Sequence, residues 1–299
     1  MAESVTAVRS RLWSAWIMTA RPATLPAAIV PVVVGTAVAG HGLPRPLSFL
    51  AALAAALLIQ IGTNFANDLF DFQKGADTAE RLGPRRVIQG GLATPDQVAR
   101  ATALTLGLAT LIGAYLVMVS GWPIAVVGLL SIVCCLAYTG GPWPLGYHGL
   151  GDLCVFVFFG VIAVVGSAYL QTGRVSALAI AASLPVGLLV TAILIVNNLR
   201  DLETDRVAGK HTLAVRLGRD GTRREFALAV LGAYCVPIGL RLVGAVGGWF
   251  WLPELTLPLA LSLVLTIARA SDGPTLNRAL KRTGQLHLLF GLLFAASLL

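Results

Sequence analysis

Charged side chains are scarce in this chain of 299 residues: Asp, Glu, Lys and Arg together make up 12% of it. Soluble domains carry about 25% charged residues, so the chain has roughly half of the expected share. Hydrophobic residues make up 57%, and the mean hydropathy is +0.81. A water-soluble fold would need one very large core with almost no polar surface. The composition therefore predicts an integral membrane protein.

Cysteine is also rare, and its four residues lie in apolar segments. None of them has CxxC spacing, and Cys134 and Cys135 are adjacent, which argues against a zinc site and against a disulfide framework. The formal net charge is +8, but the basic residues lie between hydrophobic runs rather than on a basic domain. Anionic lipid headgroups and a phosphorylated substrate are therefore the expected partners, and nucleic acid is not.

Apolar runs long enough to cross a bilayer recur along the whole sequence. We predict a single all-α domain over 1–299, with nine transmembrane helices bundled around a central cavity. Two connections, 70–97 and 199–224, are long and charged. The predicted helices are 23–41, 47–69, 98–119, 122–140, 150–170, 176–198, 225–244, 249–268 and 284–299.

The distribution of Lys and Arg predicts the orientation of these helices. Of the 22 residues of these types, only Arg45, Arg174 and Arg241 fall on one side of the predicted bundle. Loops rich in Lys and Arg remain in the cytoplasm. The N-terminus and both long connections are therefore predicted to be cytoplasmic.

Two polar stretches interrupt the apolar sequence, each at the cytoplasmic end of a predicted helix. They are NFANDLFDFQKGAD over 64–77 and NNLRDLETDRVAGK over 197–210. Both contain Asn-(Asp/Asn)-x-x-Asp, which suggests an internal repeat of a helix pair. Residues three or four positions apart share one face of a helix. The predicted columns are Asn64, Asp68 and Asp71 in the first stretch and Asn197, Asp201 and Asp205 in the second.

These carboxylates stand where a helix disfavours them. Like charges three or four residues apart repel, and a helix C-terminus is the negative end of its dipole. A bound cation is therefore expected, and because no His or Cys accompanies the acids, Mg²⁺ with oxygen ligands is favoured. In an alternative interpretation, the acids only pair with arginines at the membrane interface, namely Arg81, Arg85, Arg86, Arg200 and Arg206.

Basic residues beside the two stretches indicate what such a metal would bind. A diphosphate would be cradled by Lys74, Arg85, Arg86 and Lys210. The apolar tail of the same ligand could lie between helices, within the bilayer. A prenyl diphosphate has both of these parts.

The two stretches resemble the Asp-rich motifs of the UbiA superfamily of intramembrane aromatic prenyltransferases. The segments RPATLPAAIVPVVVG (21–35), YTGGPWPLGYHGLGD (138–152) and GKHTLAVRLG (209–218) look most similar to one branch, the 1,4-dihydroxy-2-naphthoate polyprenyltransferases of menaquinone synthesis. The resemblance implies a UbiA-like bundle in a bacterial plasma membrane. It also implies Mg²⁺-dependent transfer of a polyprenyl group from its diphosphate to 1,4-dihydroxy-2-naphthoate, with loss of CO₂ and diphosphate, to give demethylmenaquinol.

The same resemblance implies roles for individual residues. Two Mg²⁺ ions on the diphosphate would be held by the catalytic residues Asp68, Asp71, Asp201 and Asp205. Support of the metals or contact with phosphate would come from Asn64, Asn67, Asn197 and Asn198. The first motif departs from the superfamily pattern, because Gly75 occupies the position of its third acid and Asp77 follows two residues later. Asp77 is included as a further metal ligand.

Tyr138 is a candidate for the acceptor or phosphate pocket, or else an aromatic anchor at the membrane interface. Segments 70–97 and 199–224 are predicted to form a cap over the site, and Asp201 or Asp205 could take the phenolic proton. Two alternatives remain open: a UbiA-type enzyme acting on another ring, such as 4-hydroxybenzoate or homogentisate, and a secondary transporter. Transporters place coupling sites near the bilayer midplane, whereas these acids lie at helix ends.

Overall fold

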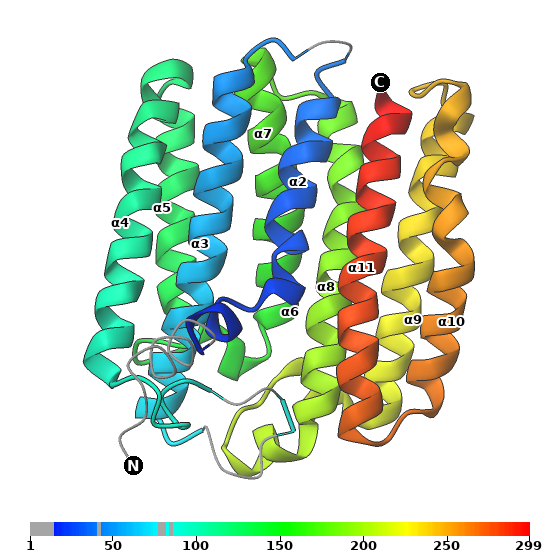
Figure 1. The fold of residues 1–299 in the computed structure, drawn as a ribbon. Coiled ribbons are helices and arrows are strands. Elements are labelled where there is room, and N and C mark those ends of the chain that lie inside the picture. The colour runs from blue at the N-terminus through cyan, green and yellow to red at the C-terminus, as the bar shows by residue number, and fades with distance from the viewer. Residues whose placement is uncertain (1–14, 41–42, 77–81, 84–85) are drawn as a thin grey trace, which may run out of the picture.

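The computed structural model describes residues 15–40, 43–76, 82–83 and 86–299. Within them the chain forms helices and no strand, which confirms the all-α prediction. The helices run roughly parallel to one another as one bundle (Figure 1). They are α2 (Pro26–Ala37), α3 (Pro46–Gln73), α4 (Pro95–Ser120), α5 (Trp122–Ala137), α6 (Gly151–Val155), α7 (Ala163–Thr172), α8 (Ala177–Val207), α9 (Leu213–Leu242), α10 (Leu257–Arg269) and α11 (Gly273–Leu298).

Six helical stretches of the described chain are long and apolar enough to cross a membrane. A seventh arises if Ala15–Thr24 and Pro26–Ala37, which meet at a bend of 46°, form one span. The apolar helix α5 has only 16 residues, and the first half of α11 carries several basic residues. The number of nine spans therefore stays a prediction. The six stretches are Pro46–Gln73, Pro95–Ser120, Gly151–Thr172, Ala177–Val207, Leu213–Leu242 and Gly248–Arg269.

Helix α8 forms the centre of the packing. In its most apolar window 72% of the residues are buried, against 22–39% in the other five spans. Its side chains Leu189, Val196 and Leu199 join the main core, to which α9 contributes Phe226 and α11 contributes Phe290. The outer helices instead expose many large apolar side chains, as expected for surfaces that face lipid.

The span Gly151–Thr172 contains a π-helical segment, Phe156–Ile162, between α6 and α7. Here Gly160 packs against Gly187 of α8, and a Cβ atom on Gly160 would lie 2.5 Å from the Gly187 Cα atom. The sequence predicted one regular helix over 150–170. The close backbone contact and the wider π turn were not predicted.

Replacing Gly160 with Ala is expected to destabilise the protein by about 1–3 kcal/mol, because the added methyl group would press on backbone atoms that cannot move aside. Gly107→Ala in α4 is the matched control, because nothing lies within 4 Å of its Cβ position. Since Ala favours a helix over Gly by about 1 kcal/mol, the control should be neutral or stabilising. Thermal unfolding in detergent would compare the two, and equal melting temperatures would contradict the predicted clash.

The prediction that 199–224 is a long loop is wrong. Helix α8 continues to Val207 and α9 begins at Leu213, so the connection between them is only 208–212. Helix α9 is kinked at Gly218, whose backbone is not helical (φ 70°, ψ 178°). The charged residues of this stretch are good helix formers, and the Thr212 side chain accepts a hydrogen bond from the backbone N–H of Val215, which caps α9. For the same reason α11 begins at Gly273, eleven residues before its predicted start at 284.

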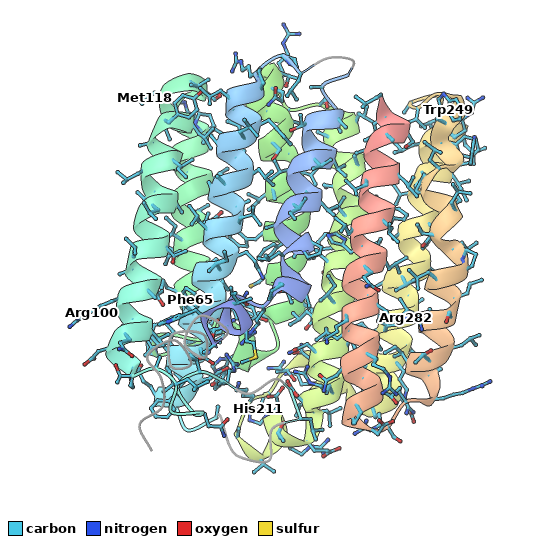
Figure 2. All side chains as sticks on the ribbon, viewed as in Figure 1. Phe65, Arg100, Met118, His211, Trp249 and Arg282 are labelled. Atoms are coloured by element: carbon cyan, nitrogen blue, oxygen red, sulfur yellow. The ribbon has the colours of Figure 1, made fainter. Side chains whose placement is uncertain are left out.

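The two polar stretches end at the same side of the bundle. Figure 2 shows His211, in the connection after α8, at the end of the bundle where Arg100 marks the start of α4. Met118 and Trp249 lie at the opposite end. The fold thus brings two segments about 130 positions apart to one edge of the molecule, as the matched motifs predicted.

Candidate active site

One cavity, with a volume of about 270 Å³, lies between α3 and α8 and receives side chains from both polar stretches. Its polar residues include Asn64, Asn67, Asp71, Asn197, Asn198, Asp201, Asp205 and Lys210. Its apolar residues include Ile59, Val155, Phe158, Phe159, Val190, Ile193 and Leu194. The cavity therefore has a charged region and a hydrophobic region, which suits a ligand with an anionic head and an apolar tail.

The face of α3 that lines the cavity differs in part from the predicted one. It carries Gln60, Asn64, Asn67 and Asp71, whereas Asp68 is not among the lining residues. Asp68 is fully buried, with 0% of its surface exposed, and its Oδ2 atom accepts a hydrogen bond of 3.2 Å from the backbone N–H of Val87. The rotation of α3 about its own axis thus points Asp71 into the cavity and Asp68 away from it.

Arg86 holds both carboxylates of the first stretch. Its Nη2 atom lies 2.8 Å from Asp71 Oδ2, and its Nη1 atom lies 3.1 Å from Asp68 Oδ1, without the alignment of a hydrogen bond. All three side chains are buried, so each charge depends on the others for compensation. The predicted pairing of these acids with interface arginines is therefore present for Arg86, which also lines the cavity.

On the α8 side, the predicted column of Asn197, Asp201 and Asp205 is confirmed, since all three line the cavity. Arg200 donates two hydrogen bonds to Asp201, from Nε to Oδ1 at 2.8 Å and from Nη2 to Oδ2 at 2.6 Å. The same guanidinium donates to Asn197 and to Asn277 of α11, both at 2.9 Å. Arg200 is buried outside the cavity lining, so it orients Asp201 while the cavity stays open to a ligand.

Lys210 joins the two stretches. Its Nζ atom lies 2.9 Å from Asp71 Oδ1 and 4.0 Å from Asp205 Oδ1. Tyr147 donates its hydroxyl proton to the same Asp71 oxygen at 2.8 Å, and Lys210 lies over its ring at 4.7 Å from the centroid. Asp71 is therefore the point at which the positive groups of the site converge.

A model of the UbiA prenyltransferase family matches residues 28–296 of the chain. The chain belongs to this family. The resemblance seen in the motifs is thereby confirmed.

Relatives within the UbiA family cover nearly the whole chain. It is 40% identical to a 1,4-dihydroxy-2-naphthoate octaprenyltransferase of Escherichia coli, over 94% of this chain and 93% of the relative. It is 41% identical to the enzyme of that name from Mycobacterium tuberculosis, over 95% and 96% of the two chains. Among solved structures, the fold is similar to that of an Archaeoglobus fulgidus UbiA homologue bound to DMAPP and Mg²⁺, with a TM-score of 0.66 at 14% identity over 94% and 99% of the chains.

The donor set of the UbiA site fits Mg²⁺ bound together with a diphosphate. In the described part of the chain, no three His, Cys, Asp or Glu side chains gather into a group that could hold a metal alone. The cavity instead offers hard oxygen donors on two facing helices, including Asp71, Asp201 and Asp205. Mg²⁺ is usually bound by one or two carboxylates, with phosphate and water completing the octahedron. The arrangement therefore suits metals bridged by a substrate diphosphate.

Some predicted residues lie at the edge of this UbiA site or outside what the structure describes. Lys74 is exposed and absent from the cavity lining, and it donates to the Gly141 carbonyl at 3.2 Å. The pKa of Lys74 lies below its ordinary value. Partial burial is the main cause and the Lys210 ammonium adds to it, while the Asp71 carboxylate acts in the opposite direction. Tyr138 lines the cavity as predicted. Asp77 and Arg85 lie outside the described residues.

Sequence reasoning missed two residues of the site, Tyr147 and Arg21. Tyr147 lies within the quoted segment 138–152, but no spacing connects it with Asp71. Arg21 lines the cavity and has φ of 53°, a left-handed conformation that non-glycine residues rarely adopt. It precedes Pro22 at the start of the bend before α2. Such backbone strain is concentrated at functional sites, and only the structure shows it.

Adjacent aromatic residues of the π-helical segment build the hydrophobic wall. On an α-helix, residues four apart drift by about 40° at each step. Val155, Phe159 and Ala163, which are spaced four residues apart along this span, nevertheless all line the cavity, as do Cys154 and Phe158. The segment thus presents two columns of side chains along the cavity.

Proposed function

We propose that this UbiA family member transfers a polyprenyl group from its diphosphate to 1,4-dihydroxy-2-naphthoate. The reaction releases CO₂ and diphosphate and gives demethylmenaquinol in menaquinone biosynthesis. The observation that carries the proposal is the match, over nearly the whole chain, to bacterial enzymes named for this acceptor. The two-part cavity supports it, because its charged and hydrophobic regions correspond to the two ends of a prenyl diphosphate.

The metal-binding residues would be Asp71, Asp201 and Asp205, with two Mg²⁺ ions on the diphosphate. Asp68 points away from the cavity and would act on the site through its ion pair with Arg86. Bound there, Mg²⁺ neutralises the charge that develops on the diphosphate as its bond to the prenyl carbon breaks. Asp77, which lies outside the described residues, remains in the proposal as a further metal ligand. The presence of Mg²⁺ with DMAPP in a structure of the same fold supports this assignment.

Residues of the chain position the diphosphate and protect the cation that its departure leaves. Lys210 and Arg86 already lie at the cavity beside Asp71, so an entering diphosphate meets both positive groups. Asn67 and Asn198 add carboxamide groups at the same end. The allylic cation would react with water, and the wall formed by Phe158 and Phe159 keeps this part of the cavity apolar.

The same proposal includes a cap over the site and an orientation of the bundle in the membrane. In this proposal, segments 70–97 and 199–224 would form a cap over the site. Arg86 and Lys210, one from each segment, line the cavity. The nine-span bundle lies in a bacterial plasma membrane, with its N-terminus and the cavity mouth cytoplasmic, as the Lys and Arg distribution predicts. A transporter is not favoured, because the acids lie near the ends of α3 and α8 and not on helices broken at their middle.

A choice among acceptors tests the proposal. Purified protein is offered a labelled polyprenyl diphosphate, Mg²⁺ and, in separate reactions, dihydroxynaphthoate, 4-hydroxybenzoate or homogentisate. We expect prenylated product with CO₂ release from dihydroxynaphthoate alone, and no product after removal of Mg²⁺ with a chelator. Turnover of another ring in place of dihydroxynaphthoate would end this assignment.

A further inference from the structure

Behind the cavity lies a buried acid that the proposed chemistry does not yet use. Asp152, the second residue of α6, is 6% exposed. Its Oδ2 atom is buried without a hydrogen-bond partner, and no basic side chain of the described residues pairs with it. Burying a carboxyl group without a partner is unfavourable, so such a group in an enzyme is a candidate for proton transfer.

Tyr138 connects this acid with the cavity. Its side chain lines the cavity, and two glycines of the following segment make room for it. A Cβ atom on Gly151, next to Asp152, would lie 2.8 Å from the Tyr138 hydroxyl oxygen, and one on Gly146 would lie 3.1 Å from its ring. That hydroxyl makes no hydrogen bond within the described residues. It is therefore available to a ligand in the cavity.

Asp152 directly follows Gly151 in the chain, so its backbone lies beside the Tyr138 hydroxyl. A tyrosine hydroxyl both donates and accepts a hydrogen bond, so it can pass a proton on while accepting another.

Two carboxylates at the mouth already have their oxygens occupied. Asp71 accepts from Arg86, Lys210 and Tyr147, and both oxygens of Asp201 accept from Arg200. These charge-assisted bonds occupy the oxygens that would have to accept a proton. A buried acid whose Oδ2 atom has no such partner, Asp152, is better placed to accept one.

We infer that Tyr138 and Asp152 form a proton relay for the hydroxyl group of the aromatic acceptor. This inference rests on the proposed function. Tyr138 would touch the substrate, whereas Asp152 would act through Tyr138. The relay assigns a proton acceptor that lies outside the two Asp-rich stretches.

With this relay, the protons, bonds and electron pairs of the prenyl transfer balance. The acceptor hydroxyl gives its proton to the Tyr138 oxygen while the Tyr138 proton moves to Asp152. The ring carbon that bears the carboxylate forms a bond to the allylic carbon, whose C–O bond breaks, and diphosphate leaves with the electron pair. The bond to the carboxylate then breaks, CO₂ leaves, and its electron pair restores the ring. Asp152 returns the proton through Tyr138 to the acceptor oxygen, so no proton is consumed.

The first test replaces each member of the relay. Tyr138→Phe and Asp152→Asn are each expected to lower kcat about 100-fold, as for the loss of a general base. The affinity for prenyl diphosphate in Mg²⁺ should be unchanged, because the proposed function assigns neither group to diphosphate binding. The double variant should be no slower than either single variant, since both remove one relay. Multiplied losses in the double variant would overturn the relay. Tyr169→Phe, at the opposite end of the bundle, is the matched control and should keep its kcat.

The second test separates a relay from a packing role. An acceptor methylated on the hydroxyl next to the carboxylate cannot donate this proton, so wild-type protein should use it about 100-fold more slowly. Tyr138→Phe should show no further loss with this acceptor, because the proton it would relay is absent. A further loss of similar size would mean that Tyr138 only packs, and would overturn the inference. Wild-type protein that fails to prenylate the unmethylated acceptor would instead refute the proposed function.

A third variant displaces the hydroxyl group without removing it. In Gly151→Ala the added methyl group would occupy the space of the Tyr138 hydroxyl, so kcat should again fall while binding of prenyl diphosphate is retained. This variant keeps both relay groups, and it tests the inference even if Asp152→Asn does not insert into the membrane. An unchanged kcat in Gly151→Ala would count against the geometry of the relay.

Discussion

Replacing Asp201 with Asn is expected to lower kcat/KM for prenyl transfer about 1,000-fold, while the protein still inserts and folds. Asp201 lines the cavity and is oriented by two bonds from Arg200. The substitution preserves its shape but removes the charge that would hold Mg²⁺ against the diphosphate. Loss of a preorganised electrostatic group in an active site costs about 100- to 1,000-fold, and loss of a metal ligand belongs at the upper end.

The matched control for Asp201→Asn lies two residues further along α8. Glu203 is 62% exposed and pairs on the surface with Arg206 at 2.7 Å. Glu203→Gln should therefore leave kcat/KM within about twofold of the wild type, because exposed ion pairs contribute little. Initial rates with labelled prenyl diphosphate would be measured at several Mg²⁺ concentrations. Asp201→Asn protein that keeps a tenth of the wild-type activity would contradict the proposed metal site.

Replacing Arg86 with Gln is expected to destabilise the protein by about 3–5 kcal/mol, since it leaves a buried charge without its partner. Asp71 would keep Lys210 at 2.9 Å, but Asp68 would lose the cation that compensates its fully buried carboxylate. The KM for prenyl diphosphate should also rise, because Arg86 lines the cavity. Unfolding in detergent, monitored by circular dichroism, would measure the first effect.

Two further variants show whether Asp68 is the cause. Arg206→Gln removes an exposed arginine from its pair with Glu203 and should cost less than about 1 kcal/mol. Adding Asp68→Asn to Arg86→Gln should restore much of the stability, because no unpaired buried charge then remains. If Arg86→Gln unfolds at the same temperature as Arg206→Gln, the buried pair does not contribute as described.

The two helix columns differ in how well their spacing predicts the face that lines the cavity. For α8, the predicted column of Asn197, Asp201 and Asp205 lines the cavity. For α3, the spacing of Asn64, Asp68 and Asp71 was equally regular, yet Asp68 points to Arg86 and Asn67 takes its place at the cavity. Adjacent residues on a helix are separated by about 100°, so periodicity alone does not fix which of two neighbouring columns faces a partner.

Helix ends were less predictable than helix existence. The apolar runs identified the helices because lipid requires about 20 apolar residues in each span. Beyond the bilayer the polar sequence has no such requirement, and the 199–224 stretch was taken for a loop although α8 and α9 continue through most of it. The cap at Thr212 and the capacity of charged residues to form helix decide these ends.

The sequence by itself determined that the chain lies in a membrane, that it is helical, and that two acidic stretches lie at one end of the bundle. These properties follow from composition and short-range spacing, which act along the chain. The tertiary structure decided which carboxylate faces the cavity, that Arg86 and Arg200 compensate the acids, and that Tyr147 and Arg21 belong to the site. It also decided that the Tyr138 hydroxyl lies beside Gly151, which precedes Asp152 in the chain. Such contacts depend on how helices rotate and pack against each other, and sequence spacing does not specify that.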